Sequence, residues 1–414
     1  MSPGHLTHEL RTVEDQLETV LGRVRALPVE VRSLADAAGF TLAGAARAAN
    51  HVPAFDNAAM DGFAVRFAEV ATATHTHPVT LRVIADVPAG SSVDPHLEPG
   101  TAVRIMTGAP MPTNADTVVP FEETGGGLAD SLATAVIVQA PRAEGTHVRA
   151  AGFDAAAGAT VLEPGVLLGA RQLSALASVG VGTVEVARRP RVAIVSTGSE
   201  LVSAGESLSR GKIPDSNGIL LAELAAEAGA EILFCEIVDD EGDGPIEAVV
   251  RAAGLRADAV IFSGGVSAGA YEPVRQSLGD VMDFVKVAMK PGKPQGFGAT
   301  PEGMLLFGLP GNPVSAAVSF EAFVRPALLR MQGRASIHRP LRTVPAGASW
   351  RTTPGRRQYL PVVIDAEARV VPVTHGSSGS HLSVSLGIAT AYAVIPTETV
   401  EVAVGDLVQV MELR

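Results

Sequence analysis

The sequence predicts a multidomain protein of the α/β plus β class: a parallel-sheet α/β domain, an inserted β-rich domain, a helical domain and a C-terminal β domain. Its 414 residues are more than one domain usually holds. Between residues 191 and 333, apolar runs alternate with helical patterns, which is typical of a parallel sheet covered by helices. On both sides of this region, short alternating runs separated by glycine and proline clusters indicate β-rich structure.

The N-terminal half predicts two helices with a β-rich insertion between them. The first helix follows Thr12, a good N-cap, because apolar residues recur at helical spacing over residues 13–24. The second is expected at about residues 171–179. Stretches such as 79–84 alternate apolar and polar positions, as half-buried strands do. We therefore expect a helical domain of residues 1–51 and 150–188, interrupted by a β-rich domain of residues 52–149.

From residue 191 the pattern changes to strands that alternate with helices. Helices are expected at residues 218–228 and 245–253. Short alternating runs return at 359–364 and 407–410, and they predict a small β-barrel or sandwich. The α/β domain should then span residues 189–334 and the C-terminal β domain residues 335–414. The expected strands of the α/β domain are residues 192–195, 232–238, 259–262, 284–287 and 304–307.

Composition places the chain among folded proteins. Hydrophobic residues make up 47% of it and charged residues 18%, whereas disordered chains are poor in apolar residues. A net charge of -12 argues against nucleic acid as a partner, because binding to its backbone depends on Lys and Arg. No apolar run reaches the roughly 18–20 residues of a transmembrane helix, and no secretory signal is visible. We expect a cytoplasmic protein without a membrane partner.

The single cysteine, Cys235, lies in the apolar run 231–238. No basic neighbour is visible that would lower the pKa of its thiol, so a buried strand residue is expected and not a nucleophile. A disulfide within the chain is excluded because there is no second cysteine.

The loops that follow the predicted strands of the α/β region are rich in glycine, serine and acidic residues. Ligands of open parallel sheets bind beyond the carboxyl ends of the strands, so chemistry is expected in these loops. Glycine and serine there expose backbone N–H groups and hydroxyls that hold a phosphate or another oxyanion. The candidates in these loops are Glu200, Asp239, Ser263, Gly264, Gly265 and Ser267.

Two further segments of the α/β region are suited to anions. Asn312 is expected at the N-cap, and Pro313 at the first position, of a helix that continues to about Met331; a helix N-terminus attracts negative charge. The segment KPGKP holds two lysines on a backbone stiffened by proline, among donor-rich loops in an acidic protein. The candidates for binding phosphate are therefore Lys286, Lys290, Lys293, Pro310, Asn312 and Pro313.

Two turns in the inserted region each combine one polar side chain with a glycine. Asp61 precedes Gly62, and Thr107 precedes Gly108. Each glycine lets the backbone turn and approach a ligand. Either turn alone is common turn chemistry, but together, and in order with the loops above, they indicate a ligand site.

In their order along the chain, these motifs resemble the serial signatures of the molybdopterin molybdenumtransferases, the MoeA and gephyrin E-domain family. The segments NAAMDGFAV and VRIMTGAP are followed by STGSEL, IPDSNG, VDDEGD, SGGVS, KPGKP and GLPGNPVS. The resemblance implies an elongated subunit, a molybdopterin-binding α/β domain and a homodimer whose active cleft joins domains of both subunits. It also implies insertion of molybdate into adenylylated molybdopterin with release of AMP, dependent on Mg2+, and possible contact with other cofactor synthesis or insertion proteins.

The resemblance also implies roles for individual residues. Catalytic roles fall on Asp61, Thr107, Glu200 and Asp239. Arg149 and Asp154, in the segment VRAAGFD, are implied in substrate binding together with Lys286 and Lys290. The candidates for holding magnesium are Asp239 and Glu272.

Three positions depart from the family pattern. Ser199 lies where the family usually has Asp, which weakens the case for a paired carboxylate beside Glu200. Glu272 stands where Asp is usual, in a slightly shorter segment, which puts its metal role in question. Phe63 replaces a more common Tyr, a change that keeps the ring and loses only a hydroxyl.

The implied reaction explains these residue types. Exchange of two molybdate oxo groups for dithiolene sulfurs releases water, so proton donors are needed nearby. Carboxylates shuttle protons or hold magnesium, and hydroxyls, lysines and backbone donors hold the oxyanion.

Two other functions stay open at the level of sequence. A molybdopterin adenylyltransferase resembles only residues 191–333, and the inserted region with Asp61 and Thr107 counts against it. A gephyrin-like dimeric scaffold would need an exposed apolar groove for a receptor peptide.

Overall fold

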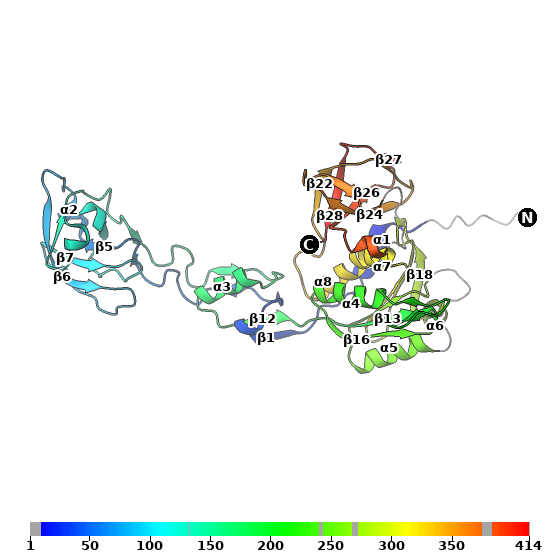
Figure 1. Ribbon diagram of the computed structural model, residues 1–414. Coiled ribbons are helices and arrows are strands. Elements are labelled where there is room, and N and C mark those ends of the chain that lie inside the picture. Colours follow the sequence, from blue (N-terminus) through cyan, green and yellow to red (C-terminus); the bar gives the residue numbers. More distant parts are fainter. Residues whose placement is uncertain (1–9, 131, 240–242, 267–271, 375–382, 414) are drawn as a thin grey trace, which may run out of the picture.

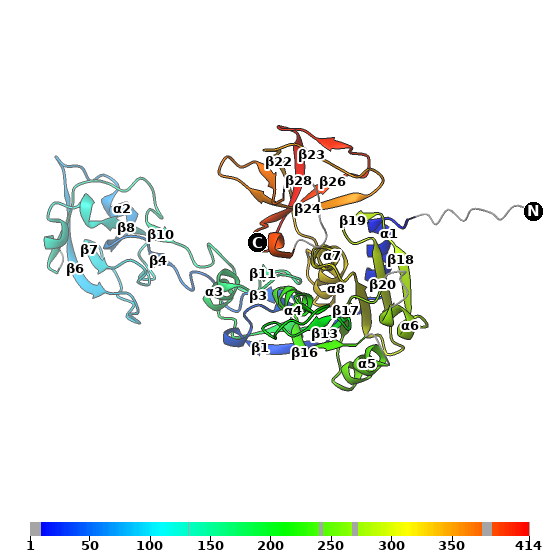
Figure 2. The same cartoon turned by 45° about the vertical axis from the view of Figure 1, so that its right-hand side comes forward.

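The chain folds into an elongated molecule, seen in a computed structural model that describes residues 10–413 except 131, 240–242, 267–271 and 375–382. The sheet of the inserted region lies at one end, and the α/β sheet and the C-terminal sheet lie together at the other (Figures 1 and 2). A narrow region around α3 (Ala170–Ser178) connects the two ends.

A six-stranded sheet forms the centre of the α/β part. Its first four strands are parallel, as expected, and the fifth runs antiparallel to both neighbours. That fifth strand was not expected from the sequence. The order is β16 (Glu231–Val238), β13 (Arg191–Thr197), β17 (Ala259–Ser263), β21 (Leu305–Leu309), β20 (Pro294–Ala299) and β18 (Met282–Lys286).

Helices cover both faces of this sheet, which explains why its inner parallel strands β13, β17 and β21 are almost uninterrupted apolar runs. Val192 and Ile194 of β13 face one core, and the alternate residues Ala193 and Val195 face the other. On the second face lie α5 (Gly244–Gly254) and α6 (Pro273–Leu278). The first face is covered by α4 (Asn217–Glu227), α7 (Pro313–Ser319), the π-helical segment η4 (Phe320–Val324), α8 (Arg325–Met331) and α1 (Val13–Leu21).

The first helix has the expected cap but an unexpected position. Thr12 Oγ1 accepts the N–H of Asp15 at 3.0 Å, which caps α1. Val13 and Val20 are buried with η4 and α8, so α1 belongs to the α/β core and not to a helical domain with residues 150–188. Helical spacing predicts the apolar stripe of α1 but not the surface that the stripe covers.

The connecting region is built mainly of strands. The expectation that residues 1–51 and 150–188 form a mainly helical domain is therefore wrong. Its helices are α3 and the single 3-10 turn η1 (Leu34–Asp36). Its strands form one three-stranded and one two-stranded sheet: β1 (Val29–Ser33), β12 (Thr183–Ala187) and β2 (Thr41–Leu42), and β3 (Ala46–Arg47) with β11 (Thr160–Leu162).

The inserted region contains a five-stranded sheet, as its alternating runs predict. One close approach within it requires glycine, because a Cβ atom on Gly62 would lie 2.1 Å from the carbonyl oxygen of Val119. The strand order is β8 (Thr117–Pro120), β5 (Gly62–Val65), β7 (Thr101–Ile105), β6 (Val79–Val87) and β9 (Thr134–Ile137). Beside it lie the pair β4 (Asn57–Ala58) and β10 (Val148–Arg149), α2 (Phe67–Val70), η2 (Phe121–Glu123) and η3 (Gly127–Asp130).

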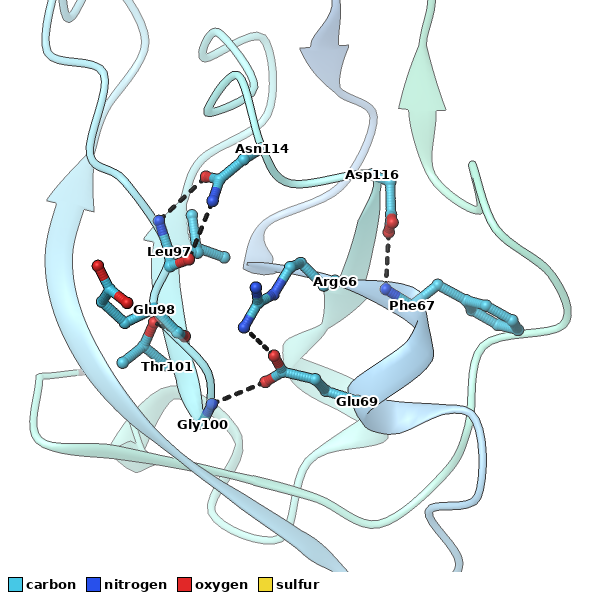
Figure 3. A network of polar contacts seen from close by, with 9 residues as sticks. All are labelled: Arg66, Phe67, Glu69, Leu97, Glu98, Gly100, Thr101, Asn114 and Asp116. Carbon is cyan, nitrogen blue, oxygen red and sulfur yellow. Dashed lines mark hydrogen bonds and ion pairs between the residues drawn. The ribbon is translucent and has the colours of Figure 1, made fainter.

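A polar network holds the loop of residues 88–100 to α2 and to the segment before β8 (Figure 3). Glu69 pairs with Arg66 and accepts the N–H of Gly100 at 2.9 Å. Asn114 exchanges two hydrogen bonds with the backbone of Leu97, at 3.0 and 2.9 Å. These contacts satisfy polar groups inside the region and have a structural role.

The C-terminal region forms a mixed six-stranded sheet with its own apolar core. One of its strands, β19 (Met289–Lys290), comes from the α/β region and pairs in parallel with β24 (Arg357–Ile364). The two regions are therefore joined through the chain around Lys290. The other strands are β26 (Ala391–Ile395), β28 (Leu407–Glu412), β22 (Leu341–Pro345) and β25 (Val370–Pro372), beside β23 (Trp350–Arg351), β27 (Glu401–Val402) and α9 (Ser383–Leu386).

Cys235 is exposed, so the expectation that it is buried is wrong. The reason is that β16 is an edge strand of its sheet. Partial burial of the thiol, and then the nearby Asp215 and Glu236, raise its pKa, and this disfavours the nucleophilic thiolate. None of the helices in the described part of the chain is both long and apolar enough to cross a membrane.

Candidate active site

A cavity of about 680 Å³ lies at the carboxyl ends of the parallel strands. After β13 the chain passes to β16 on one side of that strand and later to β17 on the other, so the strand order reverses here. Such a switch point leaves an open crevice between the loops. The cavity is lined by the loops that follow β13, β17 and β21 and by the N-terminal end of α4.

Glycine allows these loops to approach one another closely. Gly264 and Gly265 have φ angles of +93° and +64°, which other residues rarely adopt. A Cβ atom on Gly264 would lie 2.6 Å from the carbonyl oxygen of Thr197, and one on Gly265 would lie 2.9 Å from Thr197 Oγ1. The N–H of Gly264 donates to the carbonyl of Leu309 at 3.0 Å, which connects the loops after β17 and β21.

Two buried polar residues fix the start of α4 against these loops. Asp215 accepts the backbone N–H groups of Asn217 and Gly218, both at 3.0 Å. The side-chain Nδ2 of Asn217 donates to Ser263 Oγ and to the carbonyl of Gly311, each at 2.6 Å. Asp215 and Asn217 are only 8% and 7% exposed. Their segment IPDSNG is part of the family resemblance, but the sequence alone predicted no role for Asp215 or Asn217. The available signal was a run of Asp, Ser and Asn directly before a helical pattern.

Besides Asp215, two carboxylate residues line this cavity from different loops. Glu200 follows β13, and its carbonyl accepts the N–H of Ile213, which closes a small parallel pair between β14 (Leu201–Val202) and β15 (Ile213–Pro214). Glu272 directly precedes α6. Asp239, at the end of β16, is exposed and is not among the residues that line the cavity.

The cavity gathers about half of the residues that the sequence singled out. Asn312 occupies the N-cap position of α7, and Pro313 opens the helix, as expected; the Asn312 side chain makes no capping hydrogen bond. Ser267 lies outside the described residues. The expected site residues that line the cavity are Glu200, Ser263, Gly264, Gly265, Glu272, Pro310, Asn312 and Pro313.

None of the three candidate lysines is among the residues that line the cavity. Lys290 Nζ donates to Thr353 Oγ1 of the C-terminal region at 2.7 Å. Lys286 is exposed, and Lys293 is partly buried. Pro294, the last residue of the same segment, does line the cavity, so the lysine segment ends at its wall.

Asp61 and Thr107 form a hydrogen-bonded pair in the inserted region. Asp61 Oδ1 accepts both the backbone N–H and the hydroxyl of Thr107, each at 2.7 Å. The Thr107 backbone bond, followed by its hydroxyl bond, lowers the pKa of Asp61. Because the Thr107 proton is used within the pair, both exposed side chains present acceptor oxygens to a ligand.

The other two candidates of the inserted region lie near its junction with the connecting region. Arg149 pairs with Asn57 across β10 and β4, and its side chain is exposed. Asp154 is also exposed, and its N–H donates to the carbonyl of Val52 at 2.9 Å.

Within one chain the inserted region does not reach the cavity. Strands β5 and β7, which flank the pair of Asp61 and Thr107, lie at the opposite end of the molecule from β13 and β17 (Figures 1 and 2). The candidate residues therefore form two separate groups in a single subunit.

Comparison with known proteins matches three family models along the chain. A model described as the MoeA N-terminal region (domain I and II) matches residues 11–180. A model described as a probable molybdopterin binding domain matches residues 193–330, and the MoeA C-terminal region (domain IV) matches residues 343–413.

Whole proteins are similar over the same length. Molybdopterin molybdenumtransferase 2 of Mycobacterium tuberculosis is 40% identical over 412 residues, which cover 98% of this chain and 100% of the relative. Molybdopterin molybdenumtransferase of Bacillus subtilis is 34% identical, with 88% of this chain and 85% of the relative covered. The crystal structure of a molybdopterin biosynthesis MoeA protein from Pyrococcus horikosii is 31% identical with a TM-score of 0.81, and 98% of this chain and 100% of that chain are covered. This chain therefore belongs to the MoeA family of molybdopterin molybdenumtransferases.

Proposed function

We propose that this protein is a transferase of molybdenum cofactor synthesis that inserts molybdate into adenylylated molybdopterin and releases AMP. The observation that carries the proposal is the cavity at the switch point of the α/β sheet, lined by close-packed glycine loops and by Glu200 and Glu272. Full-length similarity to molybdopterin molybdenumtransferases supports the same activity.

The cavity is suited to the phosphate part of such a substrate. The hydroxyl of Ser263 is a donor for an oxyanion, as are backbone N–H groups of these loops that are not engaged between loops in the way that the N–H of Gly264 is. Lys293 directly precedes the lining residue Pro294, and Lys286 pairs with Pro294 across β18 and β20, so both add positive charge near this wall. The carboxylates Glu200 and Glu272 line the cavity and would move protons as molybdate oxygens leave as water.

The residues of the cavity fit a magnesium ion held in the usual way, by one or two carboxylates together with substrate phosphates. Glu200 and Glu272 would hold it, and its charge would assist cleavage of the phosphate bond to AMP. Within the described ranges, no group of three or more His, Cys, Asp or Glu side chains is arranged to bind a metal alone. Asp239, the other metal candidate, lies outside the lining.

We further propose that the working protein is a cytoplasmic homodimer. The pair of Asp61 and Thr107, with Arg149 and Asp154, would meet the cavity of a second subunit, since it lies far from the cavity of its own chain (Figure 1). Carriers of the finished cofactor are further candidate partners.

One assay tests the reaction directly. The purified protein is incubated with adenylylated molybdopterin, Mg2+ and molybdate, and AMP is followed over time. Release of AMP that depends on molybdate is expected. Release of AMP without molybdate would contradict insertion, and no release at all would contradict the whole proposal. Consumption of ATP and molybdopterin instead would support the rival adenylyltransferase.

A further inference from the structure

The orientation of the Asn217 amide is fixed by its neighbours. Its Nδ2 lies 2.6 Å from the carbonyl oxygen of Gly311, and a carbonyl can only accept a hydrogen bond. The reverse orientation would place two acceptor oxygens in contact. The atom facing Gly311 must therefore be the amide nitrogen.

This orientation determines the direction of the hydrogen bond to Ser263. The same Nδ2 lies 2.6 Å from Ser263 Oγ, so the hydroxyl accepts there and keeps its own proton for another partner. Ser263 is 2% exposed and lines the cavity. Its proton is thus available to an acceptor inside the cavity.

The remaining polar atom of Asn217 has no partner among the residues that the structure describes. Oδ1 is buried and makes no hydrogen bond to any of them, although the residue is only 7% exposed and lines the cavity. A buried acceptor without a partner costs stability unless a ligand or water supplies a donor. This atom is an independent sign that the side chain serves a ligand.

We propose that Asn217 is a positioning residue for the anionic ligand of this cavity. It holds the loops of Ser263 and Gly311 together and directs the Ser263 proton to a phosphate oxygen of the ligand. Its own Oδ1 accepts an N–H of the same ligand. This inference rests on the proposed function, because it takes adenylylated molybdopterin as that ligand.

The test is a double-mutant cycle on binding of adenylylated molybdopterin, measured by calorimetry. Ser263→Ala should weaken binding roughly 10- to 100-fold, the range for one hydrogen bond to a charged group. Asn217→Ala should weaken it further, because Oδ1 is lost as well. The double variant should bind about as well as Asn217→Ala alone, since Asn217 acts partly through Ser263.

Two additional variants separate positioning from general damage. Asn217→Ser keeps a small donor and should recover part of the lost affinity. Asn114→Ala is the matched control, because it also removes a side-chain amide that bonds backbone groups. Its network (Figure 3) lies in the inserted region, at the other end of the molecule from the α/β sheet (Figure 1). This variant should bind like wild type.

The outcomes are distinguishable. Wild type that does not bind adenylylated molybdopterin would overturn the proposed function and this inference with it. Wild type that binds, with Asn217→Ala within twofold of it, would overturn the inference alone. Losses that multiply in the double variant would show that Asn217 does not act through Ser263.

Discussion

At the scale of single residues, the structure gives Asp61 and Thr107 a relation that their sequence does not contain. Each lies in a turn that the sequence predicts, but the two positions are 46 residues apart, and only the pairing of β5 with β7 brings them together. Asp61 accepts two hydrogen bonds from the same residue, one from the backbone N–H and one from the hydroxyl of Thr107. Sequence reasoning had assigned hydroxyls to holding the oxyanion; here the Thr107 proton is engaged within the pair.

Replacing Asp61 tests whether this pair is functional. Asp61→Asn should lower molybdenum insertion roughly 100-fold, the scale of losing one preorganised hydrogen-bonding group. Thermal unfolding should change little, because both side chains are exposed. The control is Asp94→Asn, since Asp94 accepts the N–H and hydroxyl of Thr113 at 2.9 and 2.6 Å in the same region. Equal loss of activity in both variants would show that such pairs matter only for structure.

The pKa of Asp61 gives a prediction about pH. Its hydrogen bonds to Thr107 hold the pKa below the ordinary 3.8, so the carboxylate is charged throughout the neutral range. The stability it contributes is present above pH 3.8 and is lost only as pH falls through the lower folded value. The ratio of wild-type to Asp61→Asn activity should therefore stay constant between about pH 5.5 and 8. A ratio that changes across this range would mean that Asp61 titrates during the reaction.

At the scale of elements, the sequence predicts the apolar strands of the α/β sheet but not β20, whose residues are not those of a typical strand. The strands β13, β17 and β21 and the loops after them follow directly from buried apolar runs. β20 was missed because Pro294, Gly296 and Gly298 are typical of loops. The structure explains the last of these glycines, because a Cβ atom on Gly298 would lie 2.0 Å from the carbonyl oxygen of Val281. Such close approaches depend on a neighbouring strand, so periodicity along the chain does not reveal them.

Part of the cavity could be predicted from loops after strands, and the rest depends on contacts between elements. Ser263, Gly264 and Gly265 were predicted because they follow a strand. Asp215 and Asn217 were missed because their importance comes from contact with two loops that are distant in sequence.

Glycine substitutions test how closely the loops must approach. Gly264→Ala would require a residue at φ +93° with a Cβ atom 2.6 Å from Thr197, so we expect a loss of at least about 1–3 kcal/mol in stability and weakened ligand binding. Gly254→Ala is the control, because this glycine ends α5 with no heavy atom within 4 Å of an added Cβ. That change should be neutral or stabilise by about 0.5–1 kcal/mol. Thermal unfolding measures both, and an unchanged midpoint for Gly264→Ala would contradict the packing argument.

At the scale of the whole molecule, the elongated shape separates two sets of candidate residues. The cavity lies among β13, β17 and β21, whereas the pair of Asp61 and Thr107 lies beyond the connecting region around α3 (Figure 2). The sequence predicts both sets but not the distance between them. If both sets serve one reaction, each active cleft must take them from different subunits.

Subunit mixing tests this arrangement. Asp61→Asn and Glu200→Gln proteins should each be nearly inactive as homodimers, because every cleft contains one defect. In a heterodimer, one of the two clefts receives both intact residues. Random exchange gives about half heterodimers with one good cleft each, so activity should rise to at most about a quarter of wild type.

A cleft formed within one subunit gives the opposite result, because every cleft in the mixture would still contain one defect. Mass spectrometry of differently tagged chains shows whether heterodimers have formed. A mixture of Asp61→Asn with the control Asp94→Asn protein adds a second reference. Its heterodimers contain one intact cleft under either arrangement, so its activity should stay at about half of wild type however far exchange has gone, and a lower value would show that exchange itself damages the enzyme. Confirmed heterodimers of Asp61→Asn and Glu200→Gln without turnover would therefore exclude a cleft shared between subunits.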